Sequence, residues 1–454
     1  MYKPRRRELT LILLICIIPF VGWASIGLAR DGHVSLSTFL YPAIASAIFI
    51  SLHFALRRLA PKSDPLLLPA MAALSFIGLT MIYRLDVHMA RLQFYWVLVG
   101  AACFVLVLLL LKDYTRLGRY RYIIALGAVI LLAVTIVFGS MRNGARLWLQ
   151  IGPLSYQPSE MAKLLLVIFF AAYLADKKEL LARTGRRVGG FVVPPMKYFG
   201  PLLVMWGFSL LLLIFQRDLG SSFIFFGMFL AILYVATSRM VFVVVGIILF
   251  LVGAMFCYMG LPYVRDRVTI WLHPLSPELI QNESYQMAQS MFSIAEGGLT
   301  GCGIARGSPG YIPDVETDFI FSAIAEELGL TGALALVLLF LMLAARGMKI
   351  AIDSGDDFGK LLATGLTAVL AIQAFVIMGG TTRLIPLTGV TLPFVSYGGS
   401  SIVSNFILIA LLVKVSERQE MVFPADARQE RIRQARERAA RRASNGRTEV
   451  VRSG

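Results

Sequence analysis

The sequence predicts an all-α, polytopic membrane protein with about twelve transmembrane helices and both termini in the cytoplasm. Of its 454 residues, 57% are hydrophobic, and the mean hydropathy is +0.74. Twelve apolar runs are long enough, or nearly long enough, to cross a bilayer as helices. The fold must be helical because a lipid bilayer leaves unpaired backbone groups without hydrogen-bond partners.

The twelve runs follow one another along most of the chain. The first follows a basic start and is predicted to be a retained helix rather than a signal peptide, because it is long and no small-residue cleavage site follows it. The sixth and twelfth runs are short, so we expect their helices to begin earlier. The runs are residues 9–28, 39–56, 66–83, 92–111, 122–139, 161–175, 199–215, 219–237, 240–261, 319–345, 361–378 and 401–413.

Lysine and arginine residues indicate the orientation in the membrane. With the amino terminus inside, the inner segments before the tail carry 21 of them and the outer loops carry 10. Because positive charge favours the cytoplasmic side, residues 262–318 are predicted to form a large extracellular loop. The basic tail suits the anionic lipids of the inner leaflet. It lacks the reading module and interleaved aromatic residues of a nucleic-acid-binding segment, so no nucleic-acid partner is predicted.

Two polar segments place charges near membrane depth, where ionisable groups are costly and often functional. In QPSEMAK, Glu160 and Lys163 are three residues apart on one face of a helix that is expected to start near Pro158. They form either a local ion pair or a pair that lines a polar cavity. In QRDLGSS, Asp218 is either a helix N-cap or a carboxylate that faces the same cavity.

A third segment, residues 379–401, is too apolar for an ordinary loop and too rich in glycine and proline for a helix. We expect irregular backbone that lines a cavity or is buried in protein. Residues 398–401 then open the last helix, where free N–H groups suit an anion such as phosphate. A metal site of histidine and cysteine is not predicted, because the four cysteines form no close pair and the four histidines are scattered.

Five segments in this order carry a family resemblance: QPSEMAK, QRDLGSS, YQMAQSMFSIAEGGLTGCG, TDFIFSAIAEELG and LIPLTGVTLPFVSYGGSS. Together they resemble the SEDS family, which includes RodA, FtsW and SpoVE, and the last two are highly specific. The resemblance identifies residues 64–415 as a core of ten transmembrane helices. Residues 1–63 then form two additional helices, as in RodA-like proteins of actinobacteria, and residues 416–454 form a basic, partly disordered cytoplasmic tail.

The resemblance implies a peptidoglycan glycosyltransferase of the bacterial cytoplasmic membrane. Such proteins polymerise lipid II, an undecaprenyl-diphosphate-linked disaccharide peptide, at the outer face, in elongation or division. They are paired with a class B penicillin-binding protein. The alternatives are a lipid II flippase and an inactive scaffold partner of such a protein. No tightly bound cofactor is implied, and any Mg²⁺ is expected to accompany the diphosphate. The reaction needs a base for the attacking hydroxyl and positive charge for the leaving diphosphate.

The family's catalytic aspartate is not matched in PLSPELIQNESYQ, residues 274–286. The family pattern reads Pro-x-x-Asp-Pro-x-Gly-x-Gly-Tyr-Gln, which is two residues shorter and contains glycines that this stretch lacks. Matching from the left places the aspartate on Pro277, and matching from the right places it on Leu279. Glu278 lies between them. Three explanations stay open: Glu278 is the base, Glu283 takes its place, or polymerase activity is lost.

The remaining site residues also rest on the resemblance and on their positions. Glu160, Lys163 and Asp218 match charged positions of the family's motifs and are expected to contact substrate. Arg146 and Arg217 are weaker candidates for the diphosphate, and Ser400 lies in the predicted anion-binding helix start. The pair Thr317-Asp318 is interpreted as a plain N-cap of the helix that follows, in preference to a catalytic role.

Overall fold

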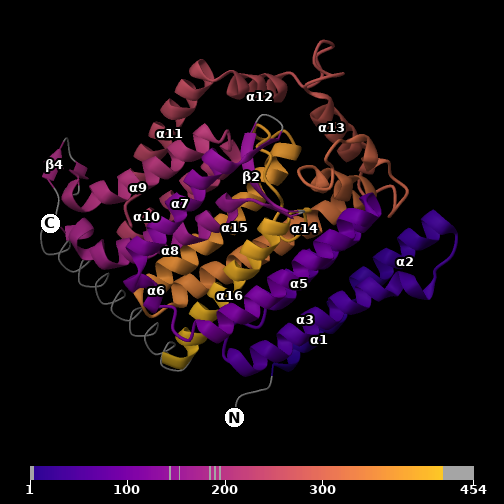
Figure 1. Cartoon of the computed structure of the whole chain (residues 1–454), viewed down its shortest axis with the longest axis horizontal. Helices are drawn as coiled ribbons and strands as arrows, with labels where there is room; N and C mark the ends of the chain where they lie inside the picture. The colour runs from indigo at the N-terminus through magenta and orange to yellow at the C-terminus, as the bar shows by residue number, and fades with distance from the viewer. Residues whose placement is uncertain are drawn as a thin grey trace, which may run out of the picture.

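The computed structural model describes residues 5–142, 145–152, 154–183, 186–188, 191–193 and 196–422. Long helices lie side by side in one bundle (Figure 1). All twelve predicted runs fall on helices. Among the described residues, eleven helices are long and apolar enough to cross a membrane, and the twelfth, Gly200–Phe215, is shorter in its described part.

The elements follow in chain order, and most of the polypeptide lies in the helices. They are α1 (Arg6–Ile15), α2 (Ile17–Asp31), η1 (Leu36–Phe39), α3 (Leu40–Leu59), α4 (Leu67–Leu85), α5 (Val87–Leu110), α6 (Arg116–Arg119), α7 (Arg121–Phe138), β1 (Ser140–Arg142), β2 (Ala145–Ile151), β3 (Leu154–Tyr156), α8 (Pro158–Arg183), β4 (Arg186–Val188), β5 (Phe191–Val193), α9 (Met196–Phe215), α10 (Leu219–Thr237), α11 (Met240–Gly260), α12 (Pro262–Leu272), α13 (Tyr285–Gly297), η2 (Pro309–Tyr311), α14 (Ile320–Asp353), α15 (Asp357–Thr381) and α16 (Gly399–Val422).

Helix starts follow local chemistry. The sixth and twelfth predicted helices begin earlier than their apolar runs, at Pro158 and Gly399, as expected. Proline suits the first turn because that turn has N–H groups without helical partners. Asp86 caps α5 by accepting a hydrogen bond from the Met89 N–H at 2.9 Å. A side-chain acceptor at this position satisfies one such N–H group.

Short strands were not expected in an all-α protein. β1, β2 and β3 form an antiparallel sheet between α7 and α8, and β4 pairs with β5 between α8 and α9. In ARLWLQI, residues 145–151, polar or amphipathic side chains alternate with aliphatic ones. Alternation with a period of two is the pattern of a strand.

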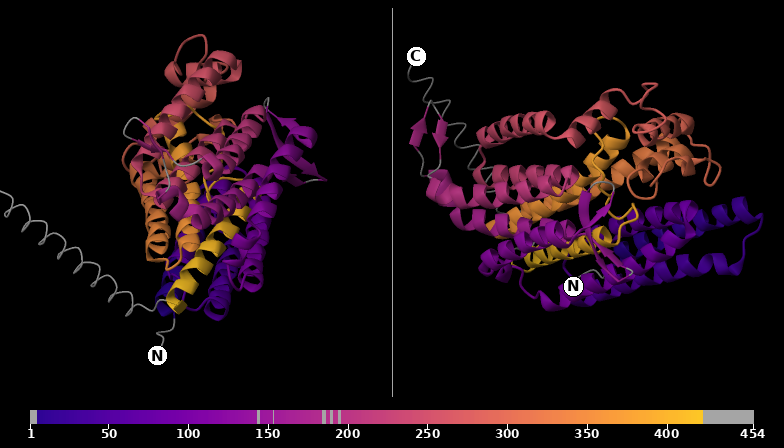
Figure 2. Two further views of the ribbon diagram at one scale, coloured as in Figure 1. Left: turned by 90° about the vertical axis from the view of Figure 1, so that its left-hand side faces the viewer. Right: turned by 45° about the horizontal axis from the view of Figure 1, so that its top comes forward.

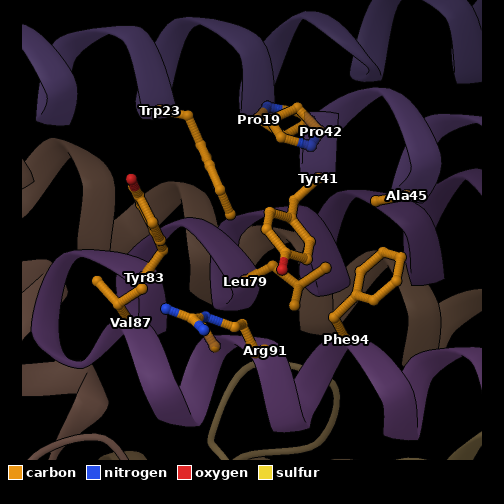
Figure 3. A pocket seen from close by; sticks show the side chains of 11 residues that line it. Pro19, Trp23, Tyr41, Pro42, Ala45, Leu79, Tyr83, Val87, Arg91 and Phe94 are labelled. Carbon is orange, nitrogen blue, oxygen red and sulfur yellow. The ribbon is translucent and has the colours of Figure 1, made fainter. Parts of the chain in front are cut away.

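The N-terminal helices α1–α3 pack along α4 and α5 on one side of the bundle (Figure 1). Trp23 of α2 stacks on Tyr83 of α4, with ring centroids 3.6 Å apart. Figure 3 shows these rings beside Tyr41 and Phe94. The cavity among them holds about 20 Å³, which is space for about one water molecule. It therefore serves packing rather than ligand binding.

A buried ionic network joins the start of α1 to the core. Arg5 Nη2 lies 2.6 Å from Glu8 Oε2, and His53 Nδ1 lies 2.8 Å from Glu8 Oε1. Arg5 Nη1 also donates a hydrogen bond to the Ala60 carbonyl at 3.0 Å. Asp64, at the end of the same connection, pairs with Arg346 of α14. The additional helices are thus held to the core by charges as well as by apolar contacts.

The two ends of the bundle are chemically distinct. The network around Arg5 and Asp64 lies at the end where α14 finishes and α16 continues to Val422. Residues 262–318, predicted to form the extracellular loop, lie at the opposite end with α12, α13 and the start of α14 (Figures 1 and 2). Residues 423–454 of the predicted tail lie outside the described residues.

Candidate functional site

A large apolar cavity lies between α9, α10, α11, α12 and the irregular segment before α16. Its volume is about 400 Å³. Phe223, Phe226 and Phe250 are among the side chains that line it. One wall is α11, whose most apolar 18-residue window has none of its residues buried, and Figure 1 shows this helix at the rim of the bundle. One wall of the cavity is therefore a helix whose apolar surface is not covered by the rest of the bundle.

Charged groups meet at the end of this cavity near the 262–318 loop. Arg267 of α12 lines the cavity, and its Nη1 donates a hydrogen bond to the Leu387 carbonyl at 2.8 Å. A Cβ built on Gly389 would lie 3.5 Å from Asp318 Oδ2 and 3.9 Å from Arg267 Nη2. Gly389 has a φ of +70° and carries no side chain, so the position beside both charged groups that a Cβ would occupy is left open.

Asp318 does not cap α14, so the sequence interpretation of Thr317-Asp318 is wrong. The N-cap position is Phe319, and no side chain caps the helix. Burial is the main cause that raises the pKa of Asp318, to about 7, with Asp314 and Glu316 adding to it and Arg267 opposing it. Neither Arg267 nor Asp318 was selected from the sequence as a site residue, because nothing local brings α12, residue 318 and Gly389 together.

Asp218 lies at the start of α10 near the same end of the cavity. Its Oδ1 accepts a hydrogen bond from the Ser221 N–H at 2.9 Å, which confirms the N-cap interpretation. Its Oδ2 is buried and has no hydrogen-bond partner among the described residues. Burial raises the pKa of Asp218. Gly220 packs against the 388–390 segment, where an added Cβ would lie 3.0 Å from the Thr388 carbonyl oxygen.

Glu160 and Lys163 form a buried pair inside the bundle. Lys163 Nζ lies 2.6 Å from Glu160 Oε2 and donates a hydrogen bond to Gln373 Oε1 at 2.7 Å. Ser404 Oγ donates to Glu160 Oε2 at 2.7 Å. Lys163 is only 2% exposed. The pair connects α8 with α15 and α16, and its charges are matched by protein groups.

The other predicted substrate contacts are spread over the same end of the molecule. Arg146 is exposed and donates to the Ile136 carbonyl at 3.3 Å. Arg217 is exposed and lies over the Tyr263 ring, 5.3 Å from its centroid. Ser400 is buried, and its Oγ accepts a hydrogen bond from the Gln157 N–H at 2.8 Å. Arg217 and Arg267 are both charged neighbours of Tyr263, whereas the polar contacts of Arg146 and Ser400 are with other residues.

Glu278 and Glu283 lie on the connection between α12 and α13, and both are exposed. No hydrogen bond or ion pair of either side chain occurs within the described part of the chain. The backbone around them is ordered by turns, including a bond from Ser284 Oγ to the Pro274 carbonyl at 2.7 Å. Neither glutamate lines the apolar cavity.

The loop beyond α13 is anchored to the core by Glu327 of α14. Glu327 Oε1 lies 2.8 Å from Arg84 Nε, and its Oε2 accepts a hydrogen bond from the Ala305 N–H at 3.0 Å. Arg84 also donates to the Gly307 carbonyl at 2.9 Å. At the other side of the site, Arg383 Nε donates to the Trp271 carbonyl at 2.9 Å and so holds the end of α12. The loop after α13 and the end of α12 are therefore each held in place by side-chain hydrogen bonds.

Known proteins resemble the chain in sequence along nearly its whole length. The RodA peptidoglycan glycosyltransferase of *Mycobacterium tuberculosis* is 41% identical over 425 residues, covering 91% of this chain and 90% of that protein. The stage V sporulation protein E of *Bacillus subtilis* is 32% identical over 367 residues, covering 78% of this chain and 96% of its own. The mycobacterial relative thus matches a larger share of this chain than the sporulation protein does.

Solved structures share the fold. A structure from a study of polymerisation and crosslinking by a peptidoglycan synthase complex matches with a TM-score of 0.67 and 28% identity, covering 79% of this chain and 98% of that one. The rod shape determining protein RodA of *Thermus thermophilus* matches with a TM-score of 0.55 and 27% identity, covering 78% and 97%. The family described as cell cycle protein, FtsW/RodA/SpoVE, matches residues 65–421. The chain is therefore a multi-pass cytoplasmic membrane protein that belongs to the FtsW/RodA/SpoVE family.

Proposed function

We propose that the chain is a peptidoglycan glycosyltransferase that polymerises lipid II at the outer face of the cytoplasmic membrane, in cell elongation or division. The observation that carries this proposal is the cavity of about 400 Å³ that Arg267 lines, with the carboxylates of Asp218 and Asp318 as charged neighbours of Arg267. An apolar chamber with charged groups at one end suits a substrate with an isoprenoid tail, a diphosphate and a sugar headgroup. The mycobacterial relative, named a peptidoglycan glycosyltransferase, supports the same activity.

The apolar part of the cavity would take the lipid tail. Its volume falls within the range of about 300–1,000 Å³ that is usual for ligand pockets. Because α11 forms one wall of the cavity and its apolar window is not buried, a displacement of this helix would admit a lipid sideways. The tail would then move from lipid to an apolar pocket without crossing water, at little desolvation cost.

The diphosphate would bind at Arg267. A guanidinium group offers several N–H donors in a plane and suits phosphate oxygens. One of its nitrogens, Nη1, is held by the Leu387 carbonyl, which fixes the group while Nη2 lies near Gly389. Mg²⁺ is bound in many proteins by one or two carboxylates together with substrate phosphates. The unpartnered Oδ2 of Asp218 would suit that role, with the cation arriving on the diphosphate.

A class B penicillin-binding protein is the proposed partner, and it would cross-link the glycan strands as they form. One structural relative comes from a study of a peptidoglycan synthase complex, which supports such a pairing. The 262–318 loop and the exposed face of α12 lie at the end of the bundle where the product would leave. A partner bound there would contact the helix that carries Arg267 and could shift the end of the cavity that Arg267 lines.

The proposal is tested by incubating the purified full-length chain with lipid II, with and without its cognate transpeptidase. We expect glycan strands that are resolved by size on a gel, and a higher yield with the partner. The absence of strands under conditions where an aspartate-bearing relative produces them would contradict the proposal. That outcome would favour the alternative of an inactive scaffold protein, which is suggested by the absence of a match to the family's catalytic aspartate.

A further inference from the structure

Asp318 is held in one place by two hydrogen-bonded segments. Its own N–H donates to the Asp314 carbonyl at 3.3 Å. On the other side, Ser396 Oγ donates to the Thr317 carbonyl at 2.5 Å, and the Tyr397 N–H donates to the Glu316 carbonyl at 2.8 Å. The residues before α14 are thus attached to the segment that also carries Gly389. A carboxylate with a fixed backbone costs little reorganisation when a substrate binds.

The surroundings of Asp318 differ from those of Glu278. Asp318 Oδ2 faces the open space at Gly389, beside the Nη2 of Arg267, and its side chain is partly buried. Glu278 is exposed on the loop after α12, and neither it nor Asp318 is among the residues that line the cavity. A general base must lie within hydrogen-bond reach of the hydroxyl from which it takes the proton. If Arg267 holds the diphosphate, the reacting anomeric carbon, one bridging oxygen from the phosphate, lies nearer to Asp318.

We propose that Asp318 is the general base of lipid II polymerisation in this chain. This inference rests on the proposed function. The 4-hydroxyl oxygen of the acceptor sugar forms a bond to the anomeric carbon of the lipid-linked donor, while the bond from that carbon to the phosphate oxygen breaks. The leaving electron pair goes to the undecaprenyl diphosphate beside Arg267. The hydroxyl proton goes to the Asp318 carboxylate and then to solvent.

The charged groups around Asp318 make the proposal testable by pH. Asp314 and Glu316 face it from its own loop and raise its pKa, and Arg267 faces it from α12 and lowers it. The base must be ionised to accept a proton. Turnover should therefore fall as the pH drops below about 7 and reach a plateau above it. This limb belongs to kcat/KM, which reports on the free enzyme.

The experiment measures the rate of glycan formation from purified lipid II by the full chain with its transpeptidase. The rate is measured at a series of pH values from about 5.5 to about 8.5. Asp318→Asn should lower the plateau by about 10²–10⁴-fold and remove the acid limb. Asp314→Asn is the matched variant, because Asp314 is exposed and asparagine tolerates its φ of +53°. It should keep the plateau and move the acid limb to lower pH, since one negative charge near Asp318 is lost.

The outcomes separate this inference from the proposed function. A wild-type chain that makes no glycan contradicts the function itself. A wild-type chain that polymerises while Asp318→Asn keeps the plateau and the acid limb overturns the inference alone. Loss of the limb in Glu278→Gln, with Asp318→Asn unchanged, would assign the base to Glu278. If Asp318→Asn fails to fold, an acid limb that does not move in Asp314→Asn would still overturn the inference.

Discussion

Lys163 donates to both Glu160 and Gln373 and is almost completely buried, so its charge is neutralised inside the bundle. The three-residue spacing of Glu160 and Lys163 predicted an ion pair, and the structure contains one. Spacing does not identify the third member, Gln373, which lies 210 positions away in the chain. The sequence could therefore predict the pair but not whether substrate or protein satisfies it.

We expect Lys163→Met to destabilise the fold, because it leaves the Glu160 carboxylate buried without a cation. Breaking a buried pair in this way typically costs about 3–5 kcal/mol. The double variant Glu160→Gln with Lys163→Met should recover much of that loss, since no uncompensated charge remains and the amide still accepts from Ser404. Thermal unfolding in detergent measures both variants. A Lys163→Met chain that unfolds at the wild-type temperature but no longer binds lipid II would instead make Lys163 a ligand.

The role of Asp318 could not be predicted from the local sequence either. A polar pair before an apolar run is typical of a helix N-cap, and here that interpretation fails. What decides the role of Asp318 is the proximity of Arg267 and Gly389, which come from two other segments. No pattern within a window of the sequence contains this information.

Among the elements, α14 contains a break that fixes the loop after α13. Gly329 has φ and ψ of 66° and −168°, a conformation that is essentially limited to glycine. The Leu330 N–H, just after it, donates to the Gly298 carbonyl at 2.9 Å. This break lets the start of α14, with Glu327, lie against the loop after α13. The sequence predicted one continuous helix here, because residues 319–345 are predominantly apolar.

Replacement of Gly329 by alanine should destabilise the loop anchored by Glu327. The added Cβ would lie 2.6 Å from the Leu299 carbonyl oxygen, and the backbone conformation disfavours any side chain. Such strain costs on the order of 1–3 kcal/mol. Limited proteolysis of residues 298–318 should become faster in Gly329→Ala. Gly207→Ala in α9, where nothing lies within 4 Å, is the control. Equal proteolysis rates in the two variants would contradict this role of Gly329.

The sequence predicted the long apolar helices, whose formation depends on hydropathy, but it did not predict the short strands. All twelve apolar runs form helices, because length and hydrophobicity suffice to specify them. The strands β1, β2 and β3 depend on short-range antiparallel pairing, which carries little hydropathy signal. The expected irregular segment is present between Thr381 and Gly399, where glycine and proline prevent a helix.

For the whole molecule, the cavity is a property of the assembled bundle. Helices α9, α10, α11 and α12 each supply part of its wall, and the Ile385–Thr388 segment closes it. The sequence motifs indicated the family and a polar cavity near Asp218, and they placed the catalytic group on the loop with Glu278. Packing instead directs Arg267 and Asp318 to the charged end, and this depends on long-range contacts across more than a hundred residues.

The proposed diphosphate site is tested most directly by comparing two arginines of α12 that are two residues apart, Arg265 and Arg267. Arg267 lines the cavity and reaches Leu387, whereas Arg265 is exposed and donates only to the Met259 carbonyl at 3.2 Å within the described residues. The measurement is the rate of glycan-strand formation from purified lipid II with the transpeptidase present. We expect Arg267→Ala to lower kcat/KM by about 10²-fold or more, because a charged hydrogen bond to the leaving diphosphate is lost, and Arg265→Ala to stay near wild type. Equal rates in the two variants, with both proteins folded, would contradict a diphosphate site at the end of this cavity.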